Sequence, residues 1–170
     1  MELKEFLGIA FEGLARNTGR ALDGLTQQEL SWRPAYGCNS IGLILLHMAR
    51  FEDNFLHVKA LGKTEAWESG KWFKILNLAE NETGSHYTAE QVCLFQSPEK
   101  KDLMRYYDAV RKNTLDYLNS AIPQAFDRKV SMPFFGEMAV GAVFAVVTGH
   151  QQQHVGEISY LRGLQRGIDK

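Results

Sequence analysis

The stretch His150-Gln-Gln-Gln-His154 decides how this chain is interpreted. It lies between Ala139 and Leu164, a segment whose pattern predicts one long helix. Histidines at positions i and i+4 lie one turn apart on the same helical face. That face also carries the apolar residues Val143, Val147 and Leu161. Both imidazoles are therefore predicted to point into a hydrophobic core.

An apolar core accepts two imidazoles only when their nitrogen atoms find hydrogen-bond partners or a metal ion. A third histidine, His47, lies in the apolar stripe of another predicted helix, which runs from about Asn39-Ser40 to Leu61. A single core histidine is more often hydrogen-bonded than a ligand, and one i, i+4 pair is a moderate signal. Together, the three predict a metal site. Three protein nitrogens leave a coordination position open, as in catalytic zinc sites, although imidazole also suits iron, nickel and copper.

The remaining pattern predicts an all-α fold, a four-helix bundle. A first helix is expected over Leu3–Leu22, and a third begins at Ser97-Pro98-Glu99, with Ser97 as its N-cap, and ends near Ser120. Each long helix has one apolar stripe, which favours packing as a bundle. Short helical insertions are expected near 71–78 and after Thr88, and residues 128–138 suit a short strand pair or an ordered loop. We expect one domain over residues 1–170.

Composition excludes several classes of function. The chain has 19 basic and 20 acidic residues, so it has no strong basic field for nucleic acid and no polybasic block for a membrane surface. The longest stretch of the last helix without a charge or histidine, residues 138–149, is too short to span a bilayer. The first residues carry acids where a signal peptide carries bases. Cys38 and Cys93 form no CxxC pattern, so we expect a cytoplasmic protein with reduced thiols.

Two motifs carry a family resemblance: NSIGLILLHMARFE from Asn39 to Glu52, and HQQQHVGEISYLRGL from His150 to Leu164. Together with residues 106–111, they resemble the DinB/YfiT-like family of metal-binding four-helix bundles, over nearly the whole chain. The resemblance implies metal ligands at His47, His150 and His154, with zinc as the leading metal and nickel or iron as alternatives. The family includes thiol-dependent S-transferases, an isomerase that uses a low-molecular-weight thiol, and metal-dependent hydrolases. Dimers are common in it, so a homodimer is expected.

One position departs from the family pattern. Family members often have Gln three residues after the last ligand, where this chain has Glu157. The spacing places Glu157 near the ligand face, as an acceptor for a ligand histidine, a general base or a carboxylate at the rim.

Other polar residues are weaker candidates. His57 is predicted to turn away from the His47 face, toward the surface. His86 is expected at the surface or, if its loop folds back, over the pocket mouth. Glu52 suits a surface or an interhelical partner. Arg162 is expected to form a salt bridge rather than hold an anionic substrate.

The leading hypothesis for function is a metal-dependent enzyme. Its ion would activate a bound water or a low-molecular-weight thiol against a small electrophilic substrate, giving hydrolysis or S-transfer. The sequence does not choose between these two reactions. The alternative is a non-enzymatic metal-binding or stress-linked interaction protein that uses the same histidines. A third reading is a helical bundle without metal, whose histidines bond to one another and to water.

Overall fold

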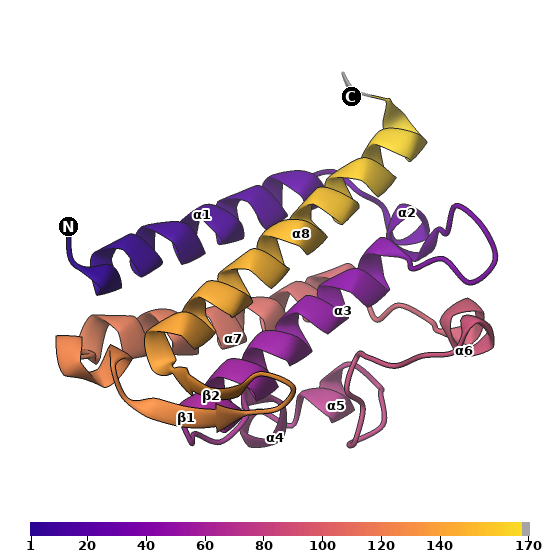
Figure 1. Cartoon of the computed structure of the whole chain (residues 1–170). Helices are drawn as coiled ribbons and strands as arrows, with labels where there is room; N and C mark the ends of the chain where they lie inside the picture. Colours follow the sequence, from indigo (N-terminus) through magenta and orange to yellow (C-terminus); the bar gives the residue numbers. More distant parts are fainter. Residues whose placement is uncertain (168–170) are drawn as a thin grey trace.

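The computed structural model describes residues 1–167 as a bundle of four long helices with short elements along one side (Figure 1). The long helices are α1 (Leu3–Leu22), α3 (Ile41–Phe51), α7 (Lys100–Ser120) and α8 (Val140–Arg166), and α3 continues as the π-helix η1 (Glu52–Ala60). The short helices are α2 (Gln27–Ser31), α4 (Ala66–Ser69), α5 (Trp72–Ile75), α6 (Ala89–Leu94) and the 3-10 turn η2 (Pro123–Phe126). The predicted all-α bundle is confirmed.

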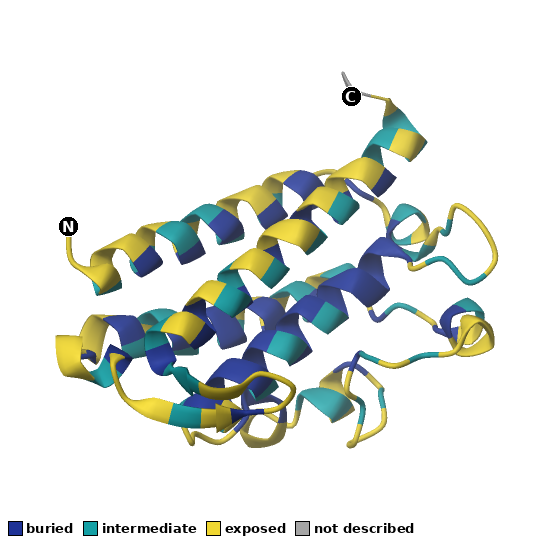
Figure 2. Cartoon of the chain, viewed as in Figure 1, coloured by how far each residue is buried: buried dark blue, intermediate teal, exposed yellow. Residues whose placement is uncertain are grey.

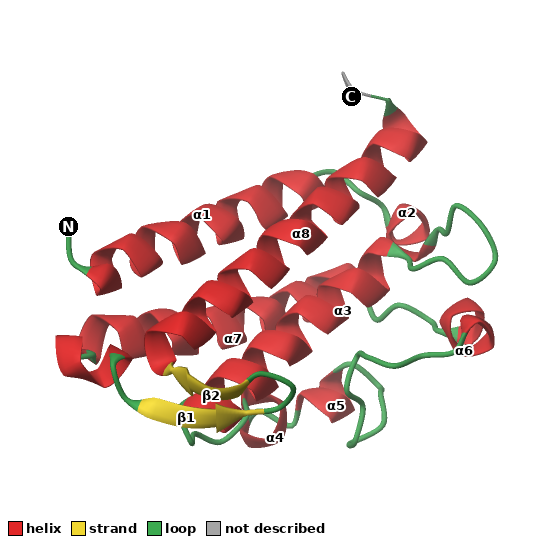
Figure 3. Cartoon of the chain, in the orientation of Figure 1, coloured by secondary structure: helices red, strands yellow, loops and turns green. Residues whose placement is uncertain are grey.

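A two-stranded hairpin precedes the last helix, which is the first of the two forms, strand pair or ordered loop, that the sequence suits. Strands β1 (Lys129–Met132) and β2 (Gly136–Ala139) pair antiparallel, with Val130 opposite Met138. Figure 3 shows these strands at the end of the bundle where α8 begins. Among residues 1–167, none of the helices has the length and apolarity that crossing a membrane requires.

The core lies between the four long helices. Helix α1 packs against α7 and α8, and α3 packs against the same two helices from the other side. Buried residues recur along all four long helices (Figure 2). Phe11 of α1 meets Phe144 of α8 edge to face, with ring centroids 5.9 Å apart, which is a favoured aromatic geometry.

Helix α3 is buried on every side rather than along one stripe. From Ile41 to Arg50, every residue is buried except His47, which keeps partial access to solvent. Helix α3 contacts α2, α7 and α8, and the chain around Gly84 lies against His47. Solvent therefore reaches this part of α3 only at His47, which is one of the candidate metal ligands.

The start of α7 differs from the prediction. The helix begins at Lys100 with Glu99 as its N-cap, and the hydroxyl of Ser97 faces that of Ser40 instead. The side chain of Gln27 explains the difference, because its Oε1 accepts from the backbone N–H of Lys100 at 2.9 Å. A residue distant in sequence therefore satisfies a free N–H group of the helix end.

The second long helix is not regular throughout. After Phe51 its turns widen into the π-helix η1, which buries the polar residues Glu52, Asp53 and His57. The prediction that His57 lies at the surface is wrong: its ring lies between Asp53 (3.1 Å from Nδ1) and Thr114 (2.8 Å from Nε2). The prediction assumed that the side of the helix that carries His57 faces solvent. In the structure, α7 covers that side.

Glu52 is an interhelical partner. Its carboxylate accepts two hydrogen bonds from the Arg111 guanidinium on α7, at 2.7 and 3.1 Å, and both side chains are buried. Arg111 also lies over the ring of Phe11. This ion pair ties η1 to α7 and α1.

We predict that Arg111→Ala lowers the free energy of unfolding by about 3–5 kcal/mol, because it leaves the Glu52 carboxylate buried without its partner. Urea denaturation measures this. The adjacent Lys112 forms an exposed ion pair with Asp116 and provides the control: Lys112→Ala should cost less than about 1 kcal/mol. Equal losses in the two variants would contradict the assignment of Arg111 to the core.

Candidate metal centre

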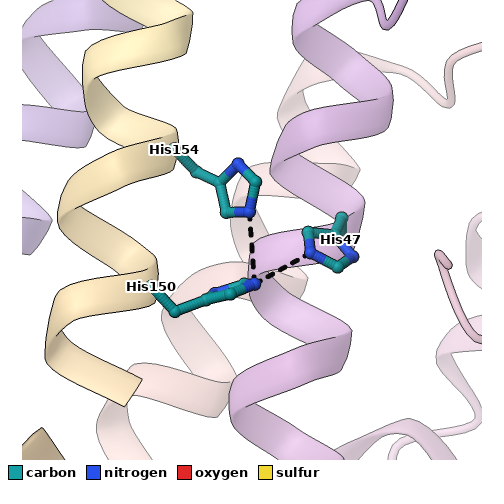
Figure 4. Close-up of side chains that lie close together, drawn as sticks. All are labelled: His47, His150 and His154. Atoms are coloured by element: carbon teal, nitrogen blue, oxygen red, sulfur yellow. Dashed lines mark hydrogen bonds between the residues drawn. The ribbon is translucent and has the colours of Figure 1, made fainter. Parts of the chain in front are cut away.

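Three imidazoles from two helices converge on one point. His47 extends from α3, and His150 and His154 extend from successive turns of α8 (Figure 4). The Nε2 atom of His150 lies 2.9 Å from Nε2 of His47 and 3.2 Å from Nε2 of His154. The i, i+4 spacing on α8 and the facing position on α3 produce the cluster that the sequence predicts.

Hydrogen bonds at Nδ1 orient the rings of His47 and His154 so that their Nε2 atoms face His150. Nδ1 of His47 lies 3.1 Å from the carbonyl oxygen of Gly84, and Nδ1 of His154 lies 2.7 Å from the carboxylate of Glu157. A carbonyl or carboxylate oxygen accepts, so both Nδ1 atoms carry the ring proton. In the neutral form of each ring, Nε2 of His47 and Nε2 of His154 then carry no proton, as metal ligation requires.

The three Nε2 atoms are better placed to hold a divalent cation than to form hydrogen bonds with one another. Nε2 of His150 carries at most one hydrogen, so it can donate to His47 or to His154 but not to both. One lone pair then remains against another nitrogen at close range. A tetrahedral zinc ion holds its nitrogen ligands roughly 3.3 Å apart, which is close to the observed spacings. Zinc, nickel and iron all accept imidazole ligands.

The loop before α6 holds His47 in place. Gly84 packs so closely that a Cβ atom there would lie 3.1 Å from the Cα atom of His47, and its φ of +69° favours glycine. The hydroxyl of Ser85 lies 2.9 Å from Nδ1 of His47. Arg50, one turn along α3, donates from Nε to the carbonyl of Glu82 at 2.9 Å and so ties down the same loop.

The surroundings of His150 favour its neutral form. Its ring stacks on Phe51 with centroids 3.8 Å apart, and its Nδ1 is buried without a partner among the described residues. Burial, followed by the neighbouring charges of His154 and His47, lowers the pKa of His150 to about 3. Burial and the charge of His154 also lower the pKa of His47, against the bond to Gly84. Both rings are neutral at pH 7 and available to a metal ion.

A hollow of about 460 Å³ opens beside the three imidazoles. Such a volume is within the range of small-molecule sites. His86 lies in its lining with an exposed side chain and a φ of +63°, so the loop does fold back to the mouth. The apolar residues of the wall are Leu43, Ile44, Phe51, Val92 and Phe134, and the remaining polar ones are Asn39, Ser85 and Tyr87.

Comparison with known proteins assigns the family. A model of the DinB superfamily matches residues 10–158, which is most of the chain. This protein belongs to the DinB superfamily. A crystal structure described as a conserved protein from Enterococcus faecalis is similar, with a TM-score of 0.84 and 19% sequence identity over 99% of each chain. At that identity the likeness shows the fold alone. A search of curated proteins found no match.

Glu157 takes one of its predicted places in this DinB fold. One carboxylate oxygen bonds His154, and the other lies 3.5 Å from Nε2 of Gln153. The residue is not part of the hollow lining, and its side chain is 41% exposed. The geometry is that of an acceptor which orients a ligand ring. Its part in chemistry stays a prediction.

Within residues 1–167, Arg162 forms no salt bridge, contrary to the expectation. Its guanidinium donates to the backbone carbonyls of Ala21 and Asp23 at the end of α1, away from the hollow. It therefore caps the C-terminal end of α1, where free carbonyl groups need donors. Sequence patterns could not supply the contact because it joins segments about 140 residues apart in the chain.

We predict that the metal-free DinB protein loses stability as pH falls from about 6.5 toward about 3. The pKa of His150 is lower in the folded state than its ordinary value of 6.5, so the unfolded chain binds more protons in this window. Stability therefore rises with pH through it. Thermal melting at several pH values, with a chelator present, measures the slope.

His150→Phe keeps the stacking partner of Phe51 and removes the titrating group, so it serves as the matched variant. We expect a flatter dependence of the melting temperature on pH for this variant. An unchanged slope would show that other groups cause the loss.

Proposed function

We propose that this DinB-superfamily protein is a metal-dependent enzyme in which His47, His150 and His154 hold a divalent ion, with zinc as the leading metal and nickel or iron as alternatives. The observation that carries the proposal is the convergence of three Nε2 atoms beside a hollow that solvent reaches. Two of these rings have the Nδ1 partners typical of metal-bound histidine. The reaction is hydrolysis or thiol-dependent S-transfer on a small electrophilic substrate.

Three imidazole ligands suit catalysis because they leave room in the coordination sphere. An ion with three protein nitrogens supplies Lewis acidity, which lowers the pKa of a water or a thiol at an open position. The chain's own contribution is to fix the rings before substrate arrives. His47 is held by the loop at Gly84, and His154 by Glu157. Such preorganisation limits the reorganisation needed during the reaction.

The hollow supports an enzyme over the non-enzymatic alternative. A purely structural metal site is normally closed by four protein ligands. Here the described residues provide a group of three, and the space beside them is lined mainly by apolar side chains such as Leu43 and Ile44. These walls suit the apolar part of a bound substrate. A small electrophile fits this space, and water or a low-molecular-weight thiol is the second reactant.

We assign Glu157 to the orientation of His154 rather than to proton abstraction. Its Oε2 lies 2.7 Å from Nδ1 of His154, so the carboxylate is already engaged. A carboxylate in this place fixes the ring and increases the basicity of Nε2. This role agrees with the absence of Glu157 from the lining of the hollow.

We predict near-stoichiometric divalent metal in protein purified without added metal, and its loss in His150→Ala and in His47→Ala. Each variant removes a ligand from a different helix, so loss in both establishes a shared site. Glu157→Gln should keep the site but weaken affinity roughly 10- to 100-fold, because only the orienting partner changes. Elemental analysis and competition with a chelator measure these quantities.

His86→Ala is the matched control, since its exposed ring does not belong to the three-histidine cluster. This variant should retain metal. A parent protein that contains no metal, and takes up none when zinc, nickel or iron is added, would contradict the proposal.

We predict that metal-loaded protein turns over a panel of model electrophiles, and that one comparison separates the two reactions. Hydrolysis proceeds without added thiol, whereas S-transfer requires it and forms a thioether product. Mass spectrometry identifies the product, and the His150→Ala variant provides the baseline. Absence of reaction with and without several low-molecular-weight thiols would contradict an enzyme of this kind.

A further inference from the structure

A second hollow adjoins the one beside the histidines. It has a volume of about 310 Å³ and lies between η1 and the tip of the β1–β2 hairpin. The two hollows share the lining residues Phe51, Ser85, His86 and Phe134. Shared walls make them two compartments of one cleft, which begins at the three imidazoles and ends near Lys59 of η1.

Aromatic rings form one wall of this cleft from end to end. Phe51 stacks on His150 at 3.8 Å, and Phe55 stacks on Phe51 at 4.8 Å with an interplanar angle of 14°. Phe135 at the hairpin tip meets Phe55 edge to face at 5.9 Å. Rings at these distances present a continuous apolar surface, which favours flat aromatic groups.

Phe134 lies at the hairpin tip and lines the cleft together with the aromatic wall. It contributes little to the packing of the protein. Its side chain is 98% exposed, and its φ of +67° is unfavourable for a bulky residue. An exposed aromatic ring on a strained backbone is a feature of binding sites. Phe134 lines both compartments, so a ligand in the cleft contacts its ring.

The charges around the cleft favour an anionic ligand. Among the residues described, no Asp or Glu lines either compartment. Lys59 lines the second one and forms no ion pair within residues 1–167. Arg50 also lines it, but its charge is matched by Glu65 at 2.9 Å. Lys59 is therefore the cation in this lining that remains for a ligand.

We propose that the cleft binds an aromatic compound that carries an anionic group. The flat ring packs between the Phe51–Phe55 wall and Phe134, and the anionic group lies at Lys59, away from the histidines. This assignment rests on the proposed function in one respect: the electrophilic end of the substrate would lie beside the three imidazoles. The binding of the aromatic anion itself does not depend on a metal or on turnover.

Binding of 2-naphthalenesulfonate to the full-length protein tests the proposal. Isothermal titration calorimetry should show one site both with zinc and after chelator treatment. Cyclohexanesulfonate lacks the aromatic ring and 2-methylnaphthalene lacks the charge. We expect each of them to bind roughly tenfold more weakly.

Two variants locate the site. Phe134→Gly should weaken binding of 2-naphthalenesulfonate roughly tenfold while leaving the melting temperature equal or higher, because glycine relieves the positive φ. Lys59→Gln should weaken it about fivefold and reduce its dependence on salt. Phe6→Ala on α1 and Lys101→Gln on α7 are controls, since both residues are exposed and line neither compartment.

The outcomes separate this proposal from the enzymatic one. Absence of binding to the parent protein, or equal binding by Phe134→Gly and Phe6→Ala, overturns the aromatic-anion site whatever the metal content. Equal affinity for cyclohexanesulfonate also overturns it. The parent protein could bind the probe through Phe134 and Lys59 and yet take up no metal. That result would support the aromatic-anion site and contradict only the proposed metal-dependent chemistry.

Discussion

The bond between Nδ1 of His47 and the carbonyl of Gly84 is the contact on which the candidate site depends. It sets the tautomer of the ring, so that Nε2 faces the two histidines of α8. The loop that supplies this carbonyl is itself held from α3, since Arg50 donates to Glu82 and lies over Trp67. Trp67 in turn donates to the carbonyl of Glu80. Helix α3 therefore presents His47 and also fixes the loop that orients it.

A buried polar network determines how α3 and η1 meet α7. Glu52 accepts from Arg111 and from the hydroxyl of Thr114 at 2.6 Å, and His57 links Thr114 to Asp53. Asp53 also accepts the backbone N–H groups of Ala66 and Trp67, both at 2.9 Å. Removing water from such groups is costly, and loss of one partner leaves an uncompensated charge. The network therefore permits one register between the helices, and that register places His47 opposite α8.

Sequence patterns predicted the parts of the site that depend on local periodicity. The spacing of His150 and His154, the apolar stripe around His47 and the short helix after Thr88 are each decided within a few residues. The burial of His57 was not predictable in this way, because a π-helix changes the turn and α7 covers the face. The loop at Gly84 was missed because its contact with His47 spans 37 residues of chain. A glycine in a polar stretch of sequence indicates a turn, but it does not indicate that the turn contacts the ring of His47.

Burial of the histidines also explains why the site suits a cation at neutral pH. The enclosure that lowers the pKa of His150 keeps its ring neutral, so protons compete weakly for the same lone pairs. Without a cation, at least one Nε2 lone pair faces another nitrogen at close range, which is unfavourable. The ring of Phe51 stacks on His150, and both residues line the hollow beside the three imidazoles. The fold thus brings together a three-histidine group suited to a metal ion and leaves a hollow beside it, which is the arrangement that the proposed chemistry requires.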